Sequence, residues 1–95
     1  MNPANLPIAC ELFAQWRRAR GDREVPATRP FSRSWEGLLE DAGICAAMDQ
    51  SDAEREARRL EEDGWVVLHS VRYRSHLIGR ITMPLEQEGR WRAAF

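Results

Sequence analysis

The sequence predicts an α+β domain in which three helices precede a β-hairpin. Before residue 64, apolar residues recur at helical spacing in three separate stretches. Over residues 65–83, β-branched and aromatic residues are concentrated instead, as is typical of strands. The chain has 95 residues, enough for one small core and too few for two, and its 43% hydrophobic and 31% charged residues are typical of a folded globular domain. We therefore expect a single domain over residues 1–95.

The first predicted helix covers residues 7–20. Pro7 suits the first turn of a helix, and Gly21 suits the position just after a helix end. Five apolar residues in this stretch share one face that we expect to enter the core: Ile8, Ala9, Leu12, Phe13 and Trp16. The following residues 21–33 contain Pro26 and Pro30 and predict a loop, with a short extended piece at residues 24–25.

The second predicted helix covers residues 33–42. Ser32 and Ser34 are both suitable capping residues, and Gly43 suits the helix end. The apolar stripe of this helix consists of Trp35, Leu38, Leu39 and Ala42.

The third predicted helix covers residues 51–63. Ser51 and Glu54 match the capping-box pattern, and Gly64 marks the end. A helical projection places Ala53, Ala57 and Leu60 toward the core. The opposite, outward face carries Arg55, Arg58, Arg59 and Glu62. Ion pairs Glu54–Arg58 and Arg55–Glu62 are expected to neutralise part of that face.

The β-hairpin is predicted over residues 65–83, with its turn at Ser75-His76 and its end at Pro84. Strict alternation places Trp65, Val67 and His69 on one face, with His69 near the core, and Arg72 and Arg74 on the other.

Residues 85–95 predict a further helix or an extended C-terminal arm. Trp91 and Phe95 are large apolar residues four positions apart. This spacing favours either an arm that packs back on the core or a surface that contacts a partner. The absence of a helix-stop signal before Phe95 also favours a domain that belongs to a longer protein.

The charges are segregated along the chain, although the net charge is only −1. Residues 17–33 carry a net +4, residues 36–63 a net −7 and residues 64–82 a net +3 with no acid. All 14 basic residues are arginine, whose planar guanidinium suits phosphate and guanine. Two basic zones therefore flank an acidic belt, and the near-neutral total does not exclude a nucleic acid. Arg17, Arg18 and Arg20 also suit the C-terminal end of a helix dipole, an equally good explanation of that cluster.

Several function classes find no support in the sequence. No G-x-S-x-G nucleophile motif, Gly-rich phosphate loop or metal-ligand spacing is present, so we expect no enzyme, no metal and no cofactor. No apolar run is long enough to span a bilayer, and no secretion signal is recognisable at the N-terminus. The two cysteines, Cys10 and Cys45, are too few for a disulfide framework. We therefore expect a cytoplasmic protein with buried free thiols.

The step from the third helix into the hairpin, Arg59-Leu60-Glu61-Glu62-Asp63-Gly64-Trp65-Val66, resembles the winged helix-turn-helix superfamily. The end of the second helix, Leu38-Leu39-Glu40-Asp41-Ala42-Gly43-Ile44, also resembles that family, and together the two motifs extend the resemblance over residues 34–83. One departure is the long connection at residues 45–50, which changes how the third helix is presented. The segments 64–66, 72–74 and 80–84 bear a fainter resemblance to winged-helix segments of Wadjet-type plasmid-defence nuclease subunits.

The resemblance implies a winged helix, a three-helix bundle followed by a β-hairpin wing, that binds duplex DNA. The domain would act as a small transcriptional regulator or as a module of a larger bacterial protein. By position, three sets of residues would contact DNA. They are Arg55, Arg58 and Arg59 in the major groove, Arg72, Arg74 and His76 on the wing, and Arg17, Arg18 and Arg33 at peripheral phosphates.

The alternative function is a protein–protein interaction module within a multi-subunit assembly. It would use the acidic belt, or it would dock on a partner or on a second copy through Trp91 and Phe95. The acids that flank the arginine face favour this alternative, because they repel phosphate.

Overall fold

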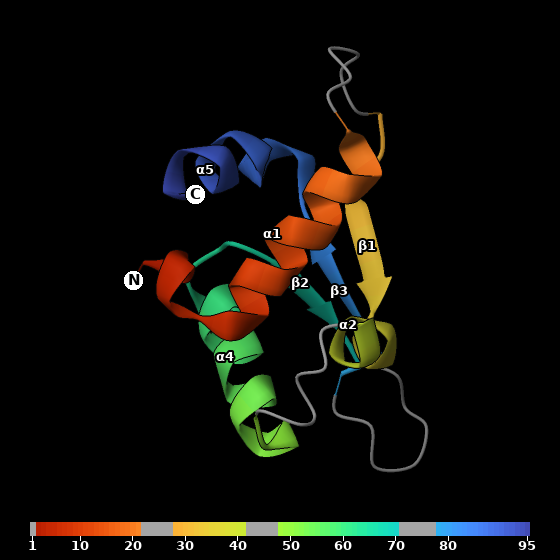
Figure 1. Cartoon of the computed structure of the whole chain (residues 1–95), viewed down its shortest axis with the longest axis vertical. Helices are drawn as coiled ribbons and strands as arrows, with labels where there is room; N and C mark the ends of the chain where they lie inside the picture. Colours follow the sequence, from red (N-terminus) through yellow and green to blue (C-terminus); the bar gives the residue numbers. More distant parts are fainter. Residues whose placement is uncertain (1, 22–27, 42–47, 71–77) are drawn as a thin grey trace.

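A computed structural model of the chain describes residues 2–21, 28–41, 48–70 and 78–95. The predicted α+β class is confirmed: four α-helices and a three-stranded antiparallel sheet lie within these ranges (Figure 1). The α-helices are α1 (Pro7–Arg20), α2 (Trp35–Asp41), α4 (Gln50–Glu62) and α5 (Glu88–Ala94). The strands are β1 (Phe31–Ser34), β2 (Val67–His69) and β3 (Arg80–Met83), and two short 3-10 turns are η1 (Pro3–Asn5) and η2 (Leu85–Gln87).

Helix α1 has the predicted bounds. Pro7 is its first residue, and Gly21 follows its end with φ +62°, a conformation that glycine adopts without strain. The five predicted apolar residues are all buried. Cys10 lies on the opposite face and is exposed, so the expected burial of this thiol is wrong; Cys45 lies outside the described residues.

Strand β1 corrects the prediction that residues 21–33 form a loop and that the second helix begins at residue 33. Residues 31–34 pair with β3, with Phe31 opposite Met83 and Ser34 opposite Arg80. The chain turns into α2 only after Ser34, whose hydroxyl accepts a hydrogen bond from the Gly37 amide at 3.1 Å. Ser34 is therefore the cap, whereas Ser32 lies within the strand.

Helix α4 begins one residue earlier than predicted and has a different cap. The Asp49 carboxylate accepts a hydrogen bond from the Ser51 amide at 3.3 Å, so the capping box of Ser51 and Glu54 is wrong. Asp satisfies an N-cap as well as Ser does, and here Asp49 lies two residues before Ser51. The predicted inward residues Ala53, Ala57 and Leu60 are buried. Gly64, at φ +79°, ends the helix and directs the chain into the hairpin.

The sheet has the order β1-β3-β2, so that β3 lies in the centre. Ile81 and Met83 of β3 face the core and are buried, while Thr82 faces outward between Ser32 and Val67. Val67 and His69 share this outer face and are exposed, which corrects the prediction that they lie with buried Trp65. The reason is that β2 begins only at Val67, so strict alternation does not extend back to Trp65.

The core lies between the inner face of the sheet and the helices. In Figure 1, α1 crosses in front of the strands, with α4 and α5 on one side and α2 on the other. All four tryptophans are buried in this core. None of the helices in the described part of the chain is long and apolar enough to cross a membrane.

The C-terminal segment forms helix α5, whose Trp91 packs on the core as one of the two expectations proposed. Trp91 is fully buried, and its indole Nε1 donates a hydrogen bond to the Trp65 carbonyl at 3.1 Å. Arg90 stacks over the Trp65 ring at 3.6 Å and donates to the Asp63 carbonyl at 2.8 Å. These contacts fasten α5 to the turn that follows α4.

Candidate nucleic-acid interface

The outward face of α4 carries the three arginines that the sequence predicts there. Arg55, Arg58 and Arg59 are all exposed. Arg55 forms an ion pair with Asp52 at 3.1 Å, one turn earlier in the helix. Within the described part of the chain, no carboxylate lies within 4 Å of the guanidinium groups of Arg58 or Arg59. The predicted pairs Glu54–Arg58 and Arg55–Glu62 are therefore wrong.

Two acids of α4 are directed toward the rest of the molecule and bind backbone amides. Glu56 accepts a hydrogen bond from the Ile8 amide at 3.2 Å, in the first turn of α1. Glu61 accepts one from the Leu68 amide at 2.9 Å, in β2. Of the two remaining acids on this helix surface, Glu54 is half-buried and Glu62 is exposed. Glu56 and Glu61 therefore have structural partners in α1 and β2, but both keep their negative charge on or beside this helix.

A groove of about 390 Å³ runs beside the first turns of α4. Its lining combines acids with arginines and two apolar side chains: Leu6, Met48, Asp49, Asp52, Arg55, Glu56 and Arg59. Three carboxylates in one groove repel phosphate, so this groove is not an anion site. Arg59 lines this groove and Arg58 does not, so Arg58 is the arginine of this face that the groove's carboxylates affect least.

Arg72, Arg74 and His76 lie outside the described residues. Strand β3 carries one further arginine. Arg80 is exposed on the outer face of the sheet, opposite His69 of β2. Its Nε donates a hydrogen bond to the Ser32 hydroxyl at 3.1 Å. The signal that could have found Arg80 is its place in the acid-free stretch of residues 64–82.

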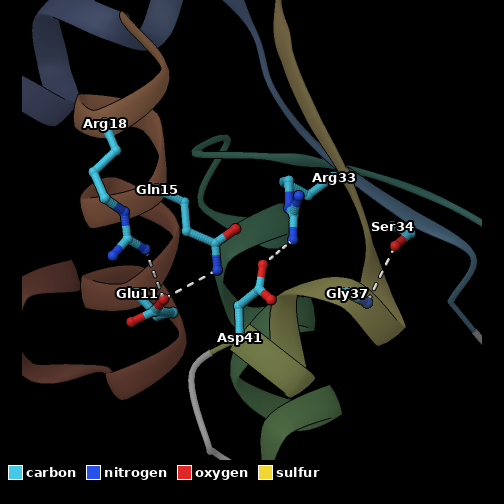
Figure 2. Close-up of polar contacts among 7 residues, drawn as sticks. All are labelled: Glu11, Gln15, Arg18, Arg33, Ser34, Gly37 and Asp41. Atoms are coloured by element: carbon cyan, nitrogen blue, oxygen red, sulfur yellow. Dashed lines mark hydrogen bonds and ion pairs between the residues drawn. The ribbon is translucent and has the colours of Figure 1, made fainter. Parts of the chain in front are cut away.

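The structure does not bring Arg17, Arg18 and Arg33 together with α4. Helix α1 meets α4 at Ile8, and Arg18 lies ten residues further on, about 15 Å along the helix axis. Arg18 forms an ion pair with Glu11 at 3.4 Å, and Arg33 forms one with Asp41 (Figure 2). These guanidinium groups are therefore engaged within the chain, away from the α4 surface.

Trp91 and Phe95 occupy different environments. Trp91 is part of the core, so its side chain is not available as a docking surface. Phe95 is 40% exposed and stacks on Phe13 with ring centroids 4.5 Å apart.

No metal centre is found among the described residues, because no three His, Cys, Asp or Glu side chains converge there.

Comparisons with protein-family models, with curated proteins and with solved structures found no match.

Proposed function

We propose that the domain is a winged helix that binds duplex DNA, with α4 as the helix that enters the major groove. The observation that carries this proposal is the exposed pair Arg58 and Arg59, which has no carboxylate partner among the described residues, while Glu56 and Glu61 are bound to backbone amides. Arginine in such a position reads guanine or binds phosphate.

The order of the elements supports the winged-helix part of the proposal. Helix α4 leads through Gly64 directly into β2 and β3, and β3 pairs with β1, which precedes α2. The β2–β3 pair therefore follows α4 directly along the chain, and Glu61 of α4 accepts a hydrogen bond from the Leu68 amide of β2. In the proposed complex, Arg72, Arg74 and His76 would contact the DNA backbone beside the groove that α4 occupies.

The test is a fluorescence anisotropy titration of a labelled duplex at a series of salt concentrations. If about five phosphates are neutralised, log K falls with log salt at a slope of roughly −4 to −5. Salt-insensitive binding, or no binding at low salt, would overturn the proposal.

The paired variant Arg58→Ala with Arg59→Ala locates the interface. We expect weaker binding and a slope smaller in magnitude by about 2, because each lost phosphate contact removes roughly 0.9 from it. Arg29→Ala with Arg92→Ala is the matched control, since it also removes two exposed arginines and neither lies on α4. An equal loss in the control would show a general charge effect and contradict the assignment of α4.

A second candidate function is a protein interaction module. The observation that favours it is Phe95, which extends the buried aromatic stack to the surface. Sedimentation at increasing concentration tests self-association: an association that Phe95→Ala removes would support this candidate, whereas a monomer throughout would leave no role for Phe95 in pairing two copies.

A further inference from the structure

A cavity of about 280 Å³ lies on the outer face of the sheet, where β3 ends. The sheet contributes Val67, His69 and Thr82 to its lining, and the neighbouring segments contribute Pro30, Pro84 and Leu85. This volume is close to the lower limit of small-molecule sites, about 300 Å³. The cavity therefore suits a ligand of the size of one substituted ring.

The walls of this cavity are largely apolar. Val67 is 42% exposed, and only one other large hydrophobic side chain in the described part of the chain is exposed to that extent. Pro30, Pro84 and Leu85 add further apolar surface around it, and none of them is fully buried. Covering this surface removes apolar area from water, which favours a ligand with an apolar body.

A chain of hydrogen bonds connects the polar side chains at one end of the cavity. His69 Nε2 lies 3.1 Å from Thr82 Oγ1, and the Thr82 hydroxyl donates to Ser32 Oγ at 3.0 Å. Arg80 Nε donates to the same Ser32 oxygen at 3.1 Å. The guanidinium of Arg80 is thereby held within about 6 Å of the Thr82 hydroxyl that lines the cavity.

The charge of Arg80 selects an anion. Its Nε is bound to Ser32, but its two terminal nitrogens have no carboxylate within 4 Å among the described residues. A guanidinium in this state matches a carboxylate, whose two oxygens accept from a planar fork of donors. Glu86 also lines the cavity, but it lies in η2, after the end of β3, whereas Arg80 is the first residue of β3. The two charges therefore favour one orientation, with the anionic group toward Arg80.

We propose that the outer face of the sheet binds a small monocarboxylate with an apolar body, such as an aromatic acid. The carboxylate accepts hydrogen bonds from the terminal nitrogens of Arg80, and the apolar body lies against Val67 and Leu85. Because the site uses no residue of α4, it does not depend on the proposed DNA binding.

The test uses benzoate as the probe and the ¹⁵N-labelled chain, observed by NMR at constant ionic strength. We expect saturable shifts of the backbone amides of Val67, His69 and Leu85, with a Kd on the order of 1 mM for a molecule of this size. Benzamide, which has the same ring and no charge, should bind at least about fivefold more weakly. Equal binding of the two compounds, or no saturable shift with benzoate, would overturn the proposal.

Arg80→Gln separates a binding role from a structural one. Glutamine removes the charge, so we expect the Kd of benzoate to rise at least about fivefold while that of benzamide stays the same. Arg92→Gln, at an exposed arginine of α5, is the matched control and should change neither Kd. Unchanged benzoate binding in Arg80→Gln, or an equal loss for both compounds, would contradict the site.

Val67→Thr tests the apolar wall and serves also if Arg80→Gln does not fold. Threonine keeps the β-branched shape that suits a strand and replaces a methyl group by a hydroxyl. Both benzoate and benzamide should then bind about threefold more weakly, because both place their ring against this side chain. Unchanged binding of both compounds in the folded variant would contradict the placement of the ring.

Discussion

The carboxylates of α4 show how side-chain direction changes the meaning of a charge count. By sequence, residues 36–63 carry a net −7, which argues against a polyanionic partner. Glu56 and Glu61 nevertheless accept hydrogen bonds from the backbone of α1 and β2. Each of these two carboxylates thus has a partner outside α4, while Arg58 and Arg59 are exposed and have no carboxylate partner among the described residues.

The arginine positions on α4 could be predicted from the sequence because a helical projection needs only the period of the helix. The ion-pair partners of these arginines could not be predicted in the same way. Arg55, for example, has Asp52 three residues before it and Glu62 seven residues after it. In the structure, the conformation of the Arg55 side chain places its guanidinium beside the Asp52 carboxylate.

The effect of adding a single Cβ atom at Gly37 of α2 can be predicted from its surroundings. A Cβ added to Gly37 would lie 2.7 Å from the Ser34 hydroxyl, which caps the helix. Alanine in place of a helical glycine ordinarily stabilises by about 1 kcal/mol, but here it displaces the capping hydroxyl, which is itself worth about 1 kcal/mol. We expect Gly37→Ala to give no gain in the free energy of unfolding, measured by chemical denaturation.

The double-mutant cycle with Ser34→Ala completes this test. In the Ser34→Ala background the 2.7 Å contact is absent and only the end of the flexible Arg33 side chain, at 3.1 Å, has to shift. The same Gly37→Ala change should then stabilise by up to about 1 kcal/mol. Identical effects in the two backgrounds would show that the hydroxyl and the new methyl group do not compete.

At the scale of elements, helix α1 depends on α4 for its start. Its capping residue, Leu6, supplies no side-chain hydrogen bond, and Glu56 of α4 accepts from the Ile8 amide instead. No local motif signals this arrangement, because the two residues lie 48 positions apart. Pro7 and Gly21 were enough to predict the helix from the sequence. They did not predict which group accepts the hydrogen bond from the Ile8 amide in its first turn.

Glu56→Ala should therefore destabilise the domain by about 1 kcal/mol, since it removes both a capping acceptor and a negative charge at a helix N-terminus. The free energy of unfolding in urea measures this loss. Glu54→Ala is the control on the same helix and should change it by less than about 0.5 kcal/mol. Equal effects would mean that the Glu56 contact contributes nothing specific.

Strand β1 is the element that the sequence did not predict. Its four residues, Phe-Ser-Arg-Ser, have no clear strand pattern and follow two prolines. They become a strand because β3 supplies pairing partners and because the Ser32 hydroxyl accepts from Thr82 Oγ1 at 3.0 Å. Such pairing spans 50 residues of sequence and leaves no local signal.

At the scale of the whole molecule, α5 joins the core through one fully buried side chain, Trp91. Besides the Trp91 contacts, Glu88 accepts hydrogen bonds from Trp16 Nε1 at 3.1 Å and from Arg20 at 2.9 Å. The segment therefore joins the two ends of the described chain. The order of helices and hairpin was predictable from periodicity, but the docking of α5 and the cavity on the outer face of the sheet arise from contacts between distant residues.

Trp91→Ala should destabilise the domain by about 3–5 kcal/mol, because it empties a fully buried indole site. Small domains are stable by only about 5–15 kcal/mol, so most of the stability would be lost. Phe95→Ala, at a ring that is 40% exposed, should cost less than about half as much. Thermal unfolding followed by circular dichroism measures both, and a small effect of Trp91→Ala would contradict the assignment of α5 to the core.

The burial of every tryptophan determines what light spectroscopy can report about this protein. Indoles at positions 16, 35, 65 and 91 are shielded from water, so the native emission maximum lies at short wavelength and moves to the red only when the chain unfolds. The edge-to-face pair formed by Trp65 and Trp91, with centroids 5.3 Å apart, is close enough for excitonic coupling in the ultraviolet. None of these indoles lies on α4. We therefore expect intrinsic emission to report the unfolding of the domain.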